Sequence, residues 1–171
     1  MTKTKKLTVL SLLIAQALAL HVIERFIPVP IPVPGVKIGL ANIITLFTII
    51  IFGFKEAVTV VISRTFLGSL FGGGPSTFLF SVVGSLTSTI IMSFLYKRFS
   101  KYFSFPTISI VGAVFHNIGQ IAIASIIVNN FNLFYYLPVL IISGVITGFF
   151  IGLTVQFTIK PLSSILQLNW R

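Results

Sequence analysis

Long apolar runs constrain the fold of this chain more than any other feature of its sequence. Only 8% of its 171 residues are charged, whereas a soluble domain carries about 25% charged residues. A membrane-spanning helix needs about 20 mostly apolar residues, and several of the runs approach or reach that length. The sequence therefore predicts an integral membrane protein of the all-α class.

Six apolar segments are the expected membrane-spanning helices of a single domain, residues 1–171. They cover roughly residues 7–27, 36–52, 57–71, 75–96, 107–128 and 133–159. The second and third are short and joined only by "GFKE", so five spans remain an alternative. No small-residue cleavage site follows the first segment, which favours a retained span over a cleaved signal peptide.

The basic residues set the expected orientation. With six spans and a cytoplasmic N-terminus, two basic residues, Arg25 and Lys37, fall outside. Nine fall inside: Lys3, Lys5, Lys6, Lys55, Lys97, Arg98, Lys101, Lys160 and Arg171. This bias is the positive-inside pattern of multi-pass membrane proteins, so both termini are expected in the cytoplasm. The net charge of +10 then requires no nucleic acid partner.

The residue types do not favour an enzyme. The chain has no cysteine and two carboxylates, Glu24 and Glu56, which the expected topology places on opposite sides of the membrane. An acid–base pair or a carboxylate-rich magnesium site cannot be built from them. The segment "GSLFGGGPST" (Gly68–Thr77) lacks the lysine of a phosphate-binding loop and is expected to form a turn. The sequence therefore predicts no catalytic residue, metal or cofactor.

Polar side chains gather in the outer half of the predicted bundle, where each is costly in lipid and a candidate for function. The candidate solute-binding residues are His21, Glu24, Lys37, Asn42, Arg64, His116, Asn117 and Gln120. Spacings of three and four residues place His21 with Glu24, and His116 with Gln120, on common helix faces. Arg64 either pairs with Glu24 or contacts the solute, and His116 either bonds another helix or lines the pocket.

Alternating prolines mark the first external loop, "IPVPIPVPGVKIGL" (Ile27–Leu40). Proline fixes φ near −65°, so the segment is expected to be stiff and extended. It is either a rigid connector or a gating loop that closes over an outward-facing pocket. The gating residues would be Pro28, Pro30, Pro32, Pro34 and Gly35.

Small residues recur every four positions in three of the spans, a spacing that lets helix backbones approach closely. Ser81 and Ser85 form a weak stripe in the fourth span. Internal packing is expected from the stripe in the sixth span, made of Gly144, Gly148 and Gly152. The stripe in the first span lies in the cytoplasmic half, away from the polar residues. It is the candidate partner-binding face: Ser11, Ala15 and Ala19.

The chain resembles, over nearly its whole length, the substrate-binding S component of an energy-coupling-factor (ECF) transporter. The resemblance rests on size, six predicted spans, cytoplasmic termini, the Ala15 and Ala19 pair, and the phrase "PGVKIGLANIITL" (Pro34–Leu46). That phrase is similar to the subgroup labelled heptaprenyl diphosphate synthase component I, or Gx transporter.

The resemblance implies a bacterial cytoplasmic membrane and an outward-facing pocket closed by the first external loop, which favours the gating interpretation. It also implies partners: a transmembrane coupling (T) subunit and two ABC-type ATPase subunits that hydrolyse the ATP. The leading hypothesis is therefore the substrate-binding subunit of an ATP-driven importer for a small vitamin-like or quinone- or isoprenoid-precursor solute.

Two other functions remain open from the residues. One is a membrane accessory protein of isoprenoid or quinone synthesis. The other is a self-sufficient secondary carrier, although residues 1–85 and 86–171 show no convincing repeat of the kind that carriers usually contain. The basic residues Arg25, Lys37 and Arg64 against the single acid Glu24 favour a solute with a carboxylate or a phosphate.

Overall fold

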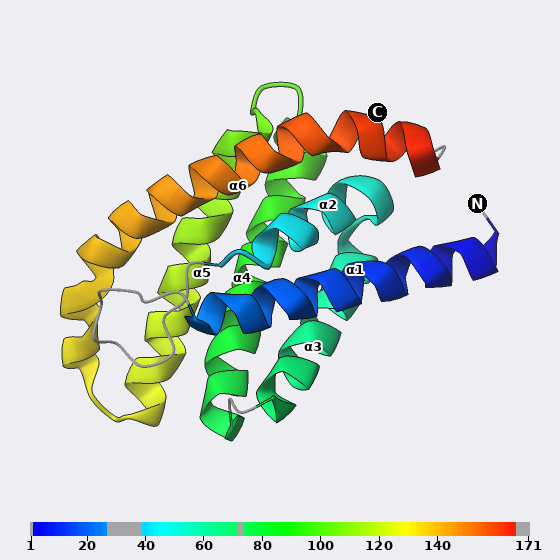
Figure 1. The fold of residues 1–171 in the computed structure, drawn as a ribbon. Coiled ribbons are helices and arrows are strands. Elements are labelled where there is room, and N and C mark those ends of the chain that lie inside the picture. Colours follow the sequence, from blue (N-terminus) through cyan, green and yellow to red (C-terminus); the bar gives the residue numbers. More distant parts are fainter. Residues whose placement is uncertain (1, 27–38, 72–73, 167–171) are drawn as a thin grey trace.

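The structure, a computed structural model, describes residues 2–26, 39–71 and 74–166, which form a helical bundle (Figure 1). In chain order its elements are α1 (Lys3–Ile23), η1 (Glu24–Phe26), α2 (Asn42–Phe52), α3 (Phe54–Leu70), α4 (Gly74–Phe99), α5 (Phe105–Ile127), η2 (Phe131–Tyr136) and α6 (Leu137–Leu166). The two η elements are short 3-10 helices. The described residues contain no strand, and the predicted all-α class is confirmed.

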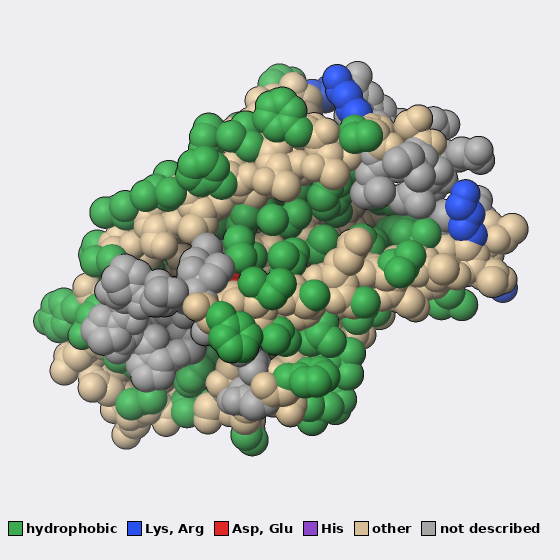
Figure 2. Space-filling view, in the orientation of Figure 1, with side chains coloured by type: hydrophobic (Ala, Val, Ile, Leu, Met, Phe, Trp, Pro, Cys, Tyr) green, Lys and Arg blue, Asp and Glu red, His purple; other side chains and the backbone are tan. Residues whose placement is uncertain are grey.

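Among the residues that the structure describes, four segments are long and apolar enough to cross a membrane: α1, α4, α5, and α6 together with η2. Large apolar side chains are exposed along these helices, among them Leu12, Ile90 and Phe150. Figure 2 shows hydrophobic side chains over much of one face of the molecule. An exposed apolar surface of this extent suits lipid rather than water, so the chain is a multi-pass membrane protein.

Helix α2 is shorter than the predicted second span, which was expected to begin at residue 36. Its 11 residues rise about 16 Å, roughly half the thickness of a hydrocarbon core. Gly39 and Gly53 have φ values of +86° and +95° and lie on either side of the helix. Because this backbone conformation is outside the α-helical region, it limits α2 at both ends. Gly53 is also the only residue between α2 and α3.

Helix α2 lies in the interior of the bundle, in contact with α1, α3, α4 and α6. Figure 1 shows it between α1 and α6. Leu46 and Ile49 of α2 join a core cluster with Met92 of α4, Ile108 of α5 and Val155 of α6. Eight of the 11 residues of α2 are buried. Protein rather than lipid therefore surrounds this helix.

Helices α5 and α6 approach closely through the predicted glycine stripe of α6. A Cβ atom on Gly148 would lie 2.7 Å from Ile110 Cα, and one on Gly152 would lie 2.3 Å from Pro106 Cα. A Cβ on Gly144 would meet the Asn117 side chain at 3.0 Å. The prediction that this stripe packs internally is confirmed, because no larger side chain fits against the α5 backbone.

Helix α1 has one face toward the bundle and another away from it. Every fourth residue of the inner face is buried: Val9, Leu13, Ala17 and His21. The predicted partner-binding residues lie on the outer face and are exposed: Ser11, Ala15 and Ala19. The larger side chains Leu7 and Ile23 continue this exposed stripe at its two ends. Ser11, Ala15 and Ala19 therefore form an exposed small-residue face on the outside of α1.

An ion pair between Lys6 and Glu56 joins the first turns of α1 and α3. The hydrogen bond that Lys6 donates holds the pKa of Glu56 below its ordinary value. Glu24 follows the last residue of α1, so the two carboxylates of the chain lie at opposite ends of that helix. The end of α1 that holds Lys6 lies on the same side of the bundle as the last turn of α6, and Lys and Arg side chains gather there (Figures 1 and 2).

Candidate solute-binding site

Buried polar side chains from five elements form the candidate site. They are His21 from α1, Glu24 from η1, Asn42 from α2, Arg64 from α3, and His116 and Gln120 from α5, each at most 5% exposed. Sequence reasoning identifies all six. Their burial fits the expectation that polar groups inside a membrane bundle face its interior.

Arg64 connects three helices. Its Nη2 donates hydrogen bonds to Asn42 Oδ1 at 3.2 Å and to Ser85 Oγ at 2.8 Å. The negative charge of Glu24 also acts favourably on the guanidinium group. Two further donors at this point, Arg64 Nε and Asn42 Nδ2, are buried and have no acceptor among the residues that the structure describes. Arg64 and Asn42 can therefore each donate a further hydrogen bond beside a buried positive charge.

Glu24 also bonds the backbone shortly before α2. The Gly39 backbone N–H donates a hydrogen bond to Glu24 Oε1. Gly39 has a φ of +86°, and a Cβ at this position would lie 3.0 Å from Asn42 Nδ2. A glycine is therefore suited to this position for two reasons, the backbone conformation and the close approach to Asn42.

His21 joins α1 to α3. A Cβ on Gly68 would lie 2.6 Å from His21 Cδ2, so the imidazole ring packs directly on the α3 backbone. Gly68 was predicted both at the end of the third span, residues 57–71, and at the start of a turn; α3 continues to Leu70 and buries Gly68 against this ring, which agrees with the predicted span. Gly68 provides the space that the histidine occupies.

His116 and Gln120 meet α4 at a glycine in the same way. A Cβ on Gly84 would lie 2.6 Å from Gln120 Cγ and 3.3 Å from His116 Cε1. Gly84 precedes Ser85, which accepts the hydrogen bond from Arg64. Arg64, Asn42 and Ser85 are called the Arg64 group below. His116 and Gln120 therefore meet this group at neighbouring residues of α4.

Asn117 is directed to a different neighbour. Its Nδ2 donates a hydrogen bond of 2.7 Å to the backbone carbonyl of Leu140 in α6. This bond ties α5 to α6 beside the glycine stripe. Asn117 is therefore not among the side chains that gather around Arg64, although it is also buried.

The remaining predicted residues lie outside the described part of the chain. Lys37 and the gating residues fall within residues 27–38: Pro28, Pro30, Pro32, Pro34 and Gly35. The two residues that flank this segment most closely in the site are Glu24 and Gly39. Their hydrogen bond brings these two residues together, and Gly39 lies beside Asn42.

Sequence reasoning missed Ser85 as a site residue and treated it as part of a packing stripe. Ser81, Ser85 and Ser88 recur at helical spacing on α4 and are all buried. A hydroxyl stripe in an apolar helix can signal hydrogen bonds as well as close packing, and that pattern is present in the sequence. The acceptor role of Ser85 depends on α3, which no local pattern identifies.

Comparison with protein families matches residues 13–158 to the family described as heptaprenyl diphosphate synthase component I. The matched segment contains all the side chains that gather around Arg64. Comparisons with curated proteins and with solved structures found no match. Since the match covers most of the 171 residues, the chain belongs to the heptaprenyl diphosphate synthase component I family.

Proposed function

We propose that this protein is the substrate-binding membrane subunit of an ATP-driven importer of the ECF type in a bacterial cytoplasmic membrane. The solute is a small vitamin-like molecule or a quinone or isoprenoid precursor that carries an anionic group. The observation that carries the proposal is the buried Arg64 group, in which α2, α3 and α4 meet around one guanidinium.

An anionic solute fits this group for a physical reason. A charge buried in a membrane bundle is costly unless partners compensate it, so an anion that binds beside it is stabilised. A carboxylate or phosphate oxygen accepts hydrogen bonds only, and Arg64 Nε and Asn42 Nδ2 are donors. Glu24 supplies a negative charge nearby, which offsets the positive charge when no solute is bound.

The proline segment serves as the gate in this proposal. Glu24 and Gly39 stand on either side of residues 27–38 in the sequence and are hydrogen-bonded to each other, and Gly39 lies beside Asn42, which supports a gate at this place. A proline-stiffened loop loses little conformational freedom on closure, which favours tight binding.

The partners are a transmembrane coupling subunit and two ABC-type ATPases. The exposed small-residue face at Ser11, Ala15 and Ala19 suits close contact with a helix of the coupling subunit. It lies on the side of α1 opposite the buried Val9 and Leu13, so assembly would not disturb the bundle core.

The family description favours a second function, an accessory membrane protein of prenyl diphosphate synthesis. Such a protein would bind a prenyl diphosphate and support a partner synthase. Native mass spectrometry of the purified chain, followed by reconstitution, separates the two functions. A bound small anion and ATP-dependent uptake with the coupling subunit and ATPases support the importer. Stimulation of a partner synthase without any uptake supports the accessory role.

The matched variants are Arg64→Gln and Arg98→Gln, since Arg98 lies in the last turn of α4 and is exposed. Arg64→Gln should lose the bound solute while the protein remains monodisperse, and Arg98→Gln should keep it. If the Arg64 variant retains the solute as well as the parent does, Arg64 is structural and this site assignment fails.

A further inference from the structure

Two hydrogen-bond donors of the Arg64 group limit the kind of anion that it can bind. Arg64 and Asn42 are 3% and 4% exposed. Arg64 Nε and Asn42 Nδ2 are buried and have no acceptor among the residues that the structure describes. A buried donor without an acceptor is unfavourable, so these two atoms favour a ligand that supplies acceptors. The group therefore offers a solute two side-chain donors, one of them on a cation.

Three backbone N–H groups beside these side chains are already bonded. The Gly39 N–H donates to Glu24 Oε1. The Asn42 N–H donates to the Gly39 carbonyl at 2.8 Å, and the Ile43 N–H donates to the Leu40 carbonyl at 3.1 Å. Phosphate sites commonly use free backbone N–H groups at the start of a helix. These three groups are engaged at the start of α2, so they do not form a phosphate site of that kind.

The charges at the group favour an anion with a single negative charge. Arg64 is the only lysine or arginine that is buried among the described residues. Glu24 is also buried, and its negative charge acts on the guanidinium group. A phosphate monoester carries a charge of about −1.5 to −2 at pH 7, whereas a carboxylate carries one negative charge. Each further negative charge is repelled by Glu24 and must be desolvated, so a carboxylate is favoured over a phosphate.

The number of donors leads to the same choice of anion. Arg64 Nη2 already donates to Asn42 Oδ1 at 3.2 Å and to Ser85 Oγ at 2.8 Å. The two remaining donors match in number the two oxygen atoms of a carboxylate. A phosphate group has three acceptor oxygens, so the same two donors leave at least one of them buried without a donor from the described residues.

We infer that the Arg64 group binds the ionised carboxylate of a carboxylic acid, and that phosphates and diphosphates are not its ligands. One carboxylate oxygen accepts a hydrogen bond from Arg64 Nε, and the other accepts one from Asn42 Nδ2. The inference rests on the proposed function, because it names the solute class of the same site. It goes further by choosing between the two anions that are compatible with that function.

The test is thermal unfolding of the full chain in detergent with five probes at matched ionic strength: acetate, benzoate, benzamide, methyl phosphate and inorganic phosphate. Acetate and benzoate should raise the midpoint in a saturable way, because a ligand that binds only the folded state stabilises it. Uncharged benzamide should not, and the two phosphates should need at least tenfold higher concentrations for the same shift. An equal or larger shift with methyl phosphate overturns the inference, as does the absence of a saturable shift with both carboxylates.

Variants locate the bound carboxylate. Arg64→Gln removes the charged donor, and Asn42→Asp replaces the amide donor by a negative charge. Each should reduce the affinity for acetate and benzoate at least tenfold. Asn42 lies in the first turn of α2, where an aspartate is compatible with the helix. Arg98→Gln is the matched control, because Arg98 is exposed in the last turn of α4. If Arg64→Gln responds to the carboxylates as Arg98→Gln does, the inference is wrong.

An uptake assay separates failure of this inference from failure of the proposed function. Native mass spectrometry identifies the solute that co-purifies with the chain, and proteoliposomes with the coupling subunit and ATPases measure its uptake. Uptake of a solute whose only anionic group is a phosphate would overturn the inference and leave the importer in place. Carboxylate binding that depends on Arg64, without ATP-dependent uptake, would support the inference while the importer proposal fails.

Discussion

Glu24 and Gly39 are joined by a hydrogen bond from the glycine backbone N–H to the glutamate carboxylate. The bond connects the residue just after α1 with the residues just before α2. Because Glu24 also acts electrostatically on Arg64, one carboxylate links the base of the proline segment to the buried positive charge. A substitution at either Glu24 or Gly39 is therefore expected to change solute affinity.

Gly39→Ala should lower both stability and solute affinity. The left-handed backbone at Gly39 costs a non-glycine residue about 1–2 kcal/mol, and the new Cβ would meet Asn42 Nδ2 at 3.0 Å. Gly74→Ala is the control, since Gly74 also has a positive φ but a Cβ at that position would have no neighbour within 4 Å. Thermal unfolding should show lower stability in both variants. Binding assays should show lower solute affinity only in Gly39→Ala. Equal solute affinities in the two variants would show that Gly39 is not part of the site.

Ser85→Ala tests the third member of the Arg64 group. The change removes the acceptor at 2.8 Å and leaves a buried guanidinium donor without its partner, which costs about 1–3 kcal/mol. Solute affinity should fall at least fivefold, because the guanidinium loses one of the bonds that orient it. Ser93→Ala is the control on the same helix, since the Ser93 hydroxyl has no partner within the described residues. Similar effects in both variants would indicate that Ser85 contributes only packing.

Gly152→Ala should destabilise the α5–α6 contact. The added Cβ would lie 2.3 Å from Pro106 Cα, and neither backbone can yield without separating the helices. Overpacking of this kind costs about 1–3 kcal/mol, which exceeds the gain of about 1 kcal/mol from replacing glycine by alanine in a helix. Thr154→Ala, at an exposed position of α6, should have little effect on thermal unfolding. An unchanged midpoint of thermal unfolding for Gly152→Ala would contradict the close contact between Gly152 and Pro106.

The Lys6–Glu56 pair should make a small contribution to stability that depends on pH. The folded pKa of Glu56 lies below its ordinary value of 4.5, so the stabilisation is complete above that pH and is lost as pH falls through the folded pKa. Both side chains are partly exposed, at 41% and 21%, and such pairs contribute about 0–1 kcal/mol. In thermal unfolding at pH 7, Glu56→Gln should therefore unfold at a slightly lower temperature than the parent. The difference between the two should narrow below pH 4.5 and also at high salt.

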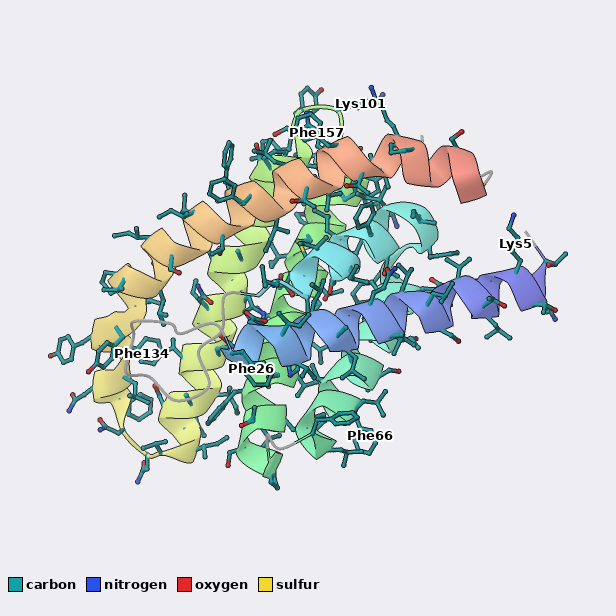
Figure 3. The ribbon with its side chains drawn as sticks, in the orientation of Figure 1. Lys5, Phe26, Phe66, Lys101, Phe134 and Phe157 are labelled. Carbon is teal, nitrogen blue, oxygen red and sulfur yellow. The ribbon has the colours of Figure 1, made fainter. Side chains whose placement is uncertain are left out.

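Ala15→Trp and Ala19→Trp should prevent assembly with a coupling subunit and its ATPases without preventing solute binding. Both alanines are exposed in the isolated chain, so the larger side chains meet no part of the bundle. A helix that packs closely on this small-residue face would be forced away. Phe66→Trp, on the outside of α3, is the control for a bulky exposed side chain (Figure 3).

Co-purification and solute binding are measured on the same preparations. Intact assembly of the alanine variants, or uptake by proteoliposomes that hold this chain alone, would exclude the proposed subunit role. Loss of solute binding together with assembly would show that the tryptophans disturb the bundle itself, and the small-residue face would then not be assigned to partner binding.

Hydropathy and residue spacing were sufficient to predict the class of the protein, the glycine contact of α6 and most of the buried polar residues. They failed for α2 because an apolar run does not reveal the left-handed glycines, Gly39 and Gly53, that limit the helix. They also failed for the partners of Asn117 and Ser85. Those bonds run between helices, and their existence depends on packing that the local sequence does not contain.

The enclosure of α2 by other helices has a consequence for how the protein responds to its bilayer. A change in bilayer thickness acts on helices in contact with lipid, which tilt or bend to reduce hydrophobic mismatch. Asn42 stands in the first turn of α2, whose neighbours are protein, so the depth of the Arg64 group is set by internal contacts. Solute affinity should therefore be similar in thin and thick membranes.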